Sequence, residues 1–451
     1  MDQVELELLR GEVDHLVEAL DQVRFRHVAG LEPEPSLVAI FDAHSRAAHR
    51  QTAATLREAG EPALAGQVAA LRAERVAAAD EERWRAADAI ASAEGPDGGV
   101  ELGSAARSIR TERNRDRRLA FGRALAQAAG ACAAARESAA EQRARARAEV
   151  GLTPDWDRVL EADDLLDESD DAYADVLAWL ARRELSLSPP PHGDLKRADL
   201  LHLLALPRYD GLFKPGMLPL VLHAALESLG LHQPKIDEGD RPGQWLGAHV
   251  FGVRVSLRRM GGAADYLDLL AAAGSVAVAR AAPFHARDPA MAEAVGTLLR
   301  RLWFEPRFLA DRLDVEKRDA ADLVRGLALR ELFRLRTHAA ALRVATEVER
   351  GMSGAAWHET HREALTLAAR ASWPGGLAAR DVDPARHANA LTGAAAAEAL
   401  RREFTERYDE DWWRNPRARS ALAGLLAAGR IPSDKRPPPE LAWAGPVAKL
   451  G

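Results

Sequence analysis

Only one stretch of this 451-residue chain alternates in the manner of a β-strand, and this limits the fold to a mainly helical one. In residues 253–257, the apolar Val253, Val255 and Leu257 alternate with polar side chains. The composition agrees, because Ala, Leu and Arg dominate and are good helix formers, whereas only 4 Tyr and 10 Phe occur. The sequence therefore predicts a mainly α protein with a small β element at residues 247–259.

Chain length and the spacing of turn residues predict two lobes and a tail. A chain of 451 residues is too long for one compact core. In residues 1–150, four long segments with helical periodicity predict an N-terminal antiparallel bundle. Residues 151–430 are expected to form a second helical domain, which holds the β element and a proline-rich linker at residues 187–193. Residues 431–451, with three consecutive prolines, are expected to form an extended tail.

Net charge and cysteine content limit the partners and the cellular compartment that we expect for the protein. A net charge of -7 gives no reason to expect nucleic acid or an anionic membrane as a partner. No run of eighteen apolar residues predicts a membrane span. The single cysteine, Cys132, excludes an internal disulfide and a cysteine-rich zinc site. We therefore expect a soluble cytoplasmic protein in which Cys132 is a small buried residue.

The strand is followed by a Gly-Gly turn and a long apolar helix, which is the order of elements in a zinc-peptidase active site. There the helix carries His-Glu-x-x-His, whose spacing places both imidazoles on one face with the glutamate between them. In this chain the motif falls on residues 271–275, where Ala271 and Ser275 replace the histidines and Ala272 replaces the glutamate. Both ligands and the base are missing.

The residues around these positions resemble a known family. Residues 265–270 (Asp-Tyr-Leu-Asp-Leu-Leu) and Gly274 resemble the active-site helix of the M3-type metallopeptidases, which include thimet oligopeptidase and oligoendopeptidase F. Residues 288–294 resemble that family's second helix, whose glutamate is the third zinc ligand and corresponds to Glu293. The resemblance extends over most of residues 150–430 and includes residues 208–210, 240–243, 332–336 and 411–417. It implies a two-lobed, gluzincin-type helical fold with a small β-ribbon beside the former active-site helix.

The resemblance also implies that the family's chemistry is lost. Alanine donates nothing to a metal, Ser275 is a poor ligand, and Glu293 alone cannot hold zinc, so we expect neither a metal nor another cofactor. In the resembled peptidases a late tyrosine, often with a histidine, stabilises the oxyanion. The corresponding residues 381–391 contain no tyrosine, and His387 is the candidate that remains.

These features predict a catalytically inactive homologue that binds a peptide or a partner protein in the remnant cleft. An extended peptide can add to an exposed sheet edge, so Val253 and Val255 of the strand are predicted contacts. Glu293 and His387 are the other predicted binding residues. The sequence does not give the oligomeric state or the identity of the ligand.

Two other interpretations remain open. The first is an active hydrolase with relocated metal or catalytic residues, which would use Glu293, His285 or the pair His358 and His361. The stretch His358-Glu359-Thr360-His361 has i, i+3 spacing, which places both imidazoles on neighbouring surface positions of a helix. The second is a structural interaction module that associates through residues 1–150.

Overall fold

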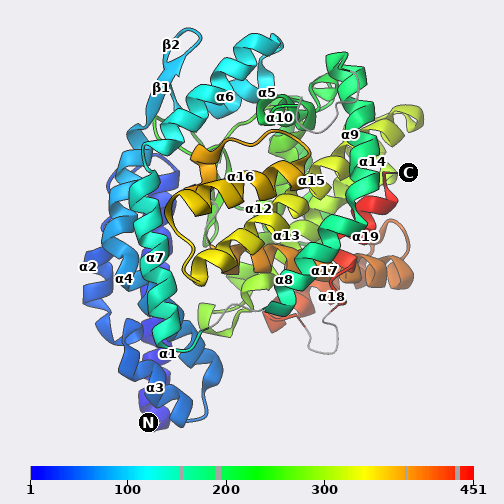
Figure 1. The fold of residues 1–451 in the computed structure, drawn as a ribbon. Coiled ribbons are helices and arrows are strands. Elements are labelled where there is room, and N and C mark those ends of the chain that lie inside the picture. Colours follow the sequence, from blue (N-terminus) through cyan, green and yellow to red (C-terminus); the bar gives the residue numbers. More distant parts are fainter. Residues whose placement is uncertain (1, 153–155, 188–194, 381–382, 432–436, 451) are drawn as a thin grey trace.

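The computed structural model describes residues 2–152, 156–187, 195–380, 383–431 and 437–450 (Figure 1). The mainly helical fold expected from the sequence is confirmed, with two small sheets beside the helices. The expected linker at residues 187–193 lies outside the described residues, except for its first residue, Leu187.

The N-terminal part of the chain forms seven helices and a β-hairpin. They are α1 (Gln3–Val28), α2 (Leu37–Ala43), α3 (Arg50–Glu58), α4 (Pro62–Ile90), β1 (Ser92–Gly95), β2 (Gly98–Glu101), α5 (Leu102–Thr111), α6 (Arg115–Gly130) and α7 (Ala133–Glu149). The apolar stripe of α1 is buried, from Leu6 to Leu20, against α2, α3 and α4. In Figure 1 these helices, in blue to cyan, line one side of the molecule.

The N-terminal helices are shorter and more numerous than the four that were expected. The turn expected after the third helix is the β-hairpin, in which Gly95 pairs with Gly98 and Gly98 has a φ of 107°. The two-residue loop Pro96-Asp97 joins the strands, and the positive φ of Gly98, the first residue of β2, favours glycine. The segment from residue 104 to 150 is divided into three helices, and Asn114 caps the second by accepting a hydrogen bond from the Arg117 amide.

Among the described residues from 156 onward, twelve α-helices surround one large apolar core. They are α8 (Trp156–Glu168), α9 (Asp170–Leu185), α10 (Arg197–Ala205), α11 (Leu218–Leu229), α12 (Ala263–Ala281), α13 (Pro289–Arg300), α14 (Pro306–Leu313), α15 (Lys317–Glu349), α16 (Gly354–Ala369), α17 (Pro384–Tyr408), α18 (Pro416–Ala428) and α19 (Leu441–Ala448). The 3-10 helix η6 (Gly375–Arg380) precedes α17. Helices α12, α13, α15 and α17 contribute to the centre of this core (Figure 1).

The β element comprises three strands, β3 (Lys235–Glu238), β4 (Gly247–Phe251) and β5 (Arg254–Arg258), in the order β3–β5–β4. The expected strand is β5, which pairs in parallel with β3 and antiparallel with β4. Val255 is fully buried, and the carbonyl of Val253 accepts a bond from the Lys235 amide. The prediction that Val253 and Val255 offer an open edge is therefore wrong, because the polar strand β3 covers that edge.

The prediction of an extended tail at residues 431–451 is wrong for its last part. Residues 441–448 form α19, in which Ala442 and Trp443 are buried. The Ala442 carbonyl accepts a 2.7 Å bond from Arg301, and the Trp443 indole donates to Glu168 at 3.1 Å. The prolines that precede α19 end before the apolar Leu-Ala-Trp run, which packs on the core.

Candidate functional site

The turn between β5 and α12 is held by Asp265. Its carboxylate accepts bonds from the amides of Met260, at 2.6 Å, and Gly261, at 3.1 Å. Burial raises the pKa of Asp265, although these two bonds oppose the shift. Gly262 begins the helix with a φ of 61°, which favours glycine. The order of strand, Gly-Gly turn and apolar helix predicted from the sequence is thus present, and α12 packs against β4.

Helix α13, which carries Glu293, lies directly beside α12. A Cβ added to Gly274 would be 2.9 Å from the Val295 carbonyl oxygen and 3.0 Å from the Gly296 Cα. A Cβ added to Gly296 would in turn be 3.0 Å from the Ala271 carbonyl oxygen. The two helix backbones therefore touch at these glycines, as the resemblance to a two-helix active site predicts.

The positions of the missing motif face this contact. Ala271 and Ala272 are buried. The Ser275 hydroxyl lies 3.4 Å from the carbonyl oxygens of both Ala271 and Ala292, so it satisfies helix backbone. None of the three side chains supplies a nitrogen or a carboxylate to a metal.

An alternating network of charges crosses α12, α13 and α15 at this place. Asp268 lies 3.7 Å from Arg300, which lies 3.8 Å from Glu331. Glu331 pairs with Arg334 at 2.9 Å, and Arg334 lies 3.9 Å from Glu293. Burial raises the pKa of Glu331, but Arg334 and Arg300 outweigh it and hold that pKa far below its ordinary value. Glu293 thus faces a fixed guanidinium.

His387 is buried and is paired with a second histidine. Its Nδ1 lies 2.9 Å from the Nδ1 of His338, so one ring donates to the other. The sequence analysis singled out His387 and missed His338. The available signal was spacing, because His338 follows Arg334 by four residues on α15 and shares its face of the helix.

The histidines proposed for relocated chemistry lie on different elements with different partners. His285 pairs with Asp14 of α1 at 2.7 Å, and His358 pairs with Glu137 of α7 at 2.6 Å. His361 is completely buried and does not share the surface of His358. Among the residues that the structure describes, no three His, Cys, Asp or Glu side chains form a group that could hold a metal ion. The structure does not bring these candidates together.

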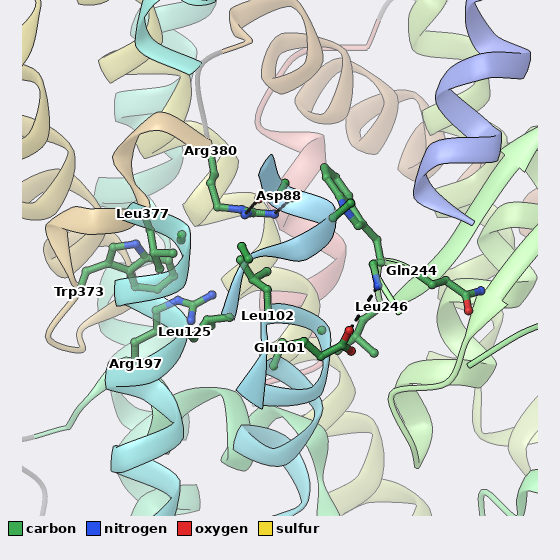
Figure 2. A pocket seen from close by; sticks show the side chains of 17 residues that line it. Asp88, Glu101, Leu102, Leu125, Arg197, Gln244, Leu246, Trp373, Leu377 and Arg380 are labelled. Atoms are coloured by element: carbon green, nitrogen blue, oxygen red, sulfur yellow. Dashed lines mark hydrogen bonds and ion pairs between the residues drawn. The ribbon is translucent and has the colours of Figure 1, made fainter. Parts of the chain in front are cut away.

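A cavity of about 260 Å³ lies between the N-terminal helices and later parts of the chain (Figure 2). One wall comes from α4, α5 and α6, and the other from η6, the start of α10 and the segment before β4. Its apolar lining includes Leu102, Leu125, Leu246, Trp373 and Leu377. We call it the apolar pocket. At one end, Arg380 points toward Asp88, with which it forms an ion pair of 2.7 Å (Figure 2).

A second cavity of about 550 Å³ adjoins the first and shares Trp245 and Arg380 with it. Helices α1, α4 and α7 form one side, and η6 and the start of α17 form the other. We call it the arginine pocket, because it is lined by Arg24, Arg85, Arg136, Arg143, Arg147, Arg380 and Arg386. The two pockets together are the cleft. None of the lining residues was a predicted site residue, because they come from many elements that are distant in sequence.

Strand β4 lies between the cleft and α12, because it packs against α12 and begins just after Trp245 and Leu246 of the cleft. Trp245 of both pockets lies 6.3 Å, ring to ring, from His249 of β4. Burial lowers the pKa of His249, and the charges of Asp268 and Arg386 also act on it. Asp268 of α12 and Arg386 of the arginine pocket therefore lie near the same imidazole.

Solved metallopeptidases have a similar fold. A structure described as an oligoendopeptidase F is 14% identical, with a TM-score of 0.56, over 94% of this chain and 83% of that chain. One described as an oligoendopeptidase F from Bacillus anthracis is 11% identical, with a TM-score of 0.50, over 100% and 85%. A Pyrococcus furiosus carboxypeptidase is 10% identical, with a TM-score of 0.55, over all of both chains. The chain therefore has a metallopeptidase-like fold.

Comparison with protein-family models gives no match, and comparison with curated protein sequences gives none. Among the described helices, none combines the length and apolar character needed to cross a membrane.

Proposed function

We propose that this protein is a catalytically inactive relative of the M3-type metallopeptidases, which binds a peptide or a segment of a partner protein in its cleft. The observation that carries the proposal is the state of the α12–α13 contact. The helix order and the close glycine contact of a two-helix zinc site are present. Ala271, Ala272 and Ser275 nevertheless offer no ligand, and Arg334 lies beside Glu293.

The charge network supports loss of the metal. A zinc ion near Glu293 would meet the positive charge of Arg334, which is itself held by the buried Glu331. This repulsion between like charges opposes the binding of a cation beside Glu293. With one carboxylate and two buried alanines, the site also lacks the three ligands that a catalytic zinc requires.

The cleft supports the binding part of the proposal. Its two cavities join apolar, aromatic and charged linings, which suits a ligand with side chains of several kinds. The sheet supplies a different edge from the one expected, because β4 has a single strand neighbour in the order β3–β5–β4. We therefore assign the peptide-pairing edge to Gly247–Phe251, in place of Val253 and Val255.

The test is to measure metal content and peptidase activity of the purified protein, and peptide binding separately. We expect no stoichiometric zinc, no cleavage of internally quenched peptides, and binding of a labelled peptide library. Replacing Trp245, which lines both pockets, by alanine should weaken that binding. Stoichiometric zinc together with turnover would overturn the assignment.

We place the protein in a reducing compartment such as the cytoplasm. Its single cysteine, Cys132, is buried, and burial raises the pKa of the thiol. Such a thiol is little ionised at neutral pH and reacts slowly.

A further inference from the structure

The arginine pocket has more positive charge than its own carboxylates neutralise. Seven arginines line it, against Glu74, Glu81 and Asp383. Three of its arginines pair with carboxylates outside this lining: Arg136 and Arg380 with Asp88, at 3.0 and 2.7 Å, and Arg147 with Glu349. The surplus remains positive when such partners are included.

Single carboxylates are shared among several guanidinium groups. Glu81, which is almost fully buried, pairs with Arg24 at 3.0 Å, with Arg85 at 2.8 Å and with Arg143 at 2.9 Å. Asp88 is shared by two more arginines in the same way. A carboxylate has two oxygens, whereas each guanidinium has five N–H donors. The cluster is therefore short of acceptors.

The ring of Trp84 contacts two of these guanidinium groups, in addition to their shared carboxylate partners. Arg136 lies 3.8 Å and Arg85 4.5 Å from the ring centre of Trp84. Buried nitrogens of both side chains, Nε of Arg136 and Nη1 of Arg85, have no hydrogen-bond partner within the described parts of the chain. Burial, followed by the charge of Arg380, lowers the pKa of Arg136 to about 10. Stacked guanidinium groups keep their plane fixed and suit carboxylate or phosphate groups.

We propose that the arginine pocket binds acidic side chains of the peptide in the cleft, so that the ligand is a segment with at least two neighbouring carboxylates. This assignment rests on the proposed function and adds the ligand's chemical class. The adjoining apolar pocket favours a peptide over a free polyphosphate. A peptide can place acidic residues in one pocket and an apolar residue in the next, across Trp245 and Arg380. A small anion fills only the first.

The experiment uses a fluorescent hexapeptide with blocked termini that contains two adjacent glutamates followed by a leucine. Its matched control carries glutamines in place of the glutamates, and blocking removes any terminal carboxylate. We expect the acidic peptide to bind at least about tenfold more tightly by fluorescence anisotropy, since charge-assisted hydrogen bonds to arginine are strong. That advantage should shrink as salt is raised.

Two substitutions on α7 test whether the acidic peptide binds in the arginine pocket. Arg143→Gln removes one charge from the pocket while Arg24 and Arg85 still neutralise Glu81, so the fold is retained. It should weaken the acidic peptide about fivefold and leave the glutamine peptide unchanged. The control, Arg145→Gln, changes an exposed residue of the same helix outside the pocket and should have no effect.

A second pair of variants tests the opposite wall. Arg386→Gln changes an exposed arginine at the start of α17 that lines the pocket, and Arg407→Gln changes an exposed arginine at the other end of that helix. Only the first should weaken the acidic peptide.

Equal affinity for the two peptides would overturn the inference and leave a peptide-binding protein without metal in place. Binding of tripolyphosphate without binding of the acidic peptide would overturn it as well. Zinc with turnover would instead remove the proposed function itself, whatever the peptides show.

Discussion

At the scale of single residues, Gly274 sets how closely α12 and α13 approach. The neighbouring backbone leaves no room for a methyl group, since an added Cβ would be 2.9 Å from a carbonyl oxygen. This requirement is independent of any metal ligand, because Ala271, Ala272 and Ser275 around Gly274 offer none. The glycine therefore serves helix packing, whatever its part in chemistry.

We predict that Gly274→Ala lowers the free energy of unfolding by about 1–3 kcal/mol, because the two helices must move apart. The control is Gly424→Ala in α18, where an added Cβ meets nothing within 4 Å. That change should raise stability by about 0.5–1 kcal/mol, since alanine restricts the unfolded chain. Urea denaturation of both variants measures the two effects, and a neutral Gly274→Ala would contradict the close contact.

A buried histidine near the cleft makes stability depend on pH. Burial, followed by the charge of Arg85, lowers the pKa of His27 from 6.5 to about 4. Between these values the unfolded chain holds a proton that the folded chain does not, so stability is full above pH 6.5 and falls as pH drops toward 4. We predict a loss of up to about 3 kcal/mol from this residue.

The variant His27→Gln should remove that contribution. Its unfolding free energy, followed by denaturant titration at several pH values, should change less than that of the wild type between pH 6.5 and 4. Above pH 7 the two proteins should differ by a constant amount. A parallel decline of both proteins would show that other groups dominate.

At the scale of elements, a buried ion pair joins α6 to α10. Arg118 and Asp199 are both fully buried, and their closest atoms are 2.7 Å apart. The adjacent Arg117 pairs with Asp97, and both of those side chains are exposed. Replacing each of these two neighbouring arginines of α6 therefore allows a buried ion pair to be compared with an exposed ion pair.

We predict that Arg118→Ala costs about 3–5 kcal/mol of unfolding free energy, because Asp199 is left buried beside only the partly exposed Arg115. Arg117→Ala should cost at most about 1 kcal/mol. Thermal and urea unfolding of the two variants give the comparison. Equal effects would mean that Asp199 finds another partner or water.

The elements also show what sequence patterns can and cannot predict. The order of β5, turn and α12 was predicted because alternation and helical periodicity are local, whereas the placement of the Glu293 helix beside α12 was implied by the family resemblance. The strand β3 was missed because Lys235, Asp237 and Glu238 give it no apolar pattern. The prediction that Val255 lies on an open edge was wrong because β3, which pairs with β5, was not recognised. Which strands pair depends on segments that are distant in sequence. A cleft was expected, but its lining residues were not predicted, because helices distant in sequence supply its arginines.

At the scale of the whole molecule, the charge network around Glu293 and the proposed absence of a zinc site predict that metal ions do not change thermal stability. A zinc ion that bound only the folded protein at a hundred times its Kd would add about 2.7 kcal/mol of stability. We predict no change in Tm on adding zinc or EDTA, measured by calorimetry at neutral pH. A metal-dependent Tm would show that Glu293 and its surroundings still hold an ion.

Trp245 and Arg380 belong to both pockets, and this has a thermodynamic consequence for whatever enters them. An anion that binds in the arginine pocket and draws Arg380 away from Asp88 changes the wall of the neighbouring apolar pocket. By linkage, a ligand bound in the apolar pocket must then change the affinity of the arginine pocket for the anion by the same factor. The two halves of one ligand would then be recognised jointly, so that neither fragment alone reports the strength of the whole.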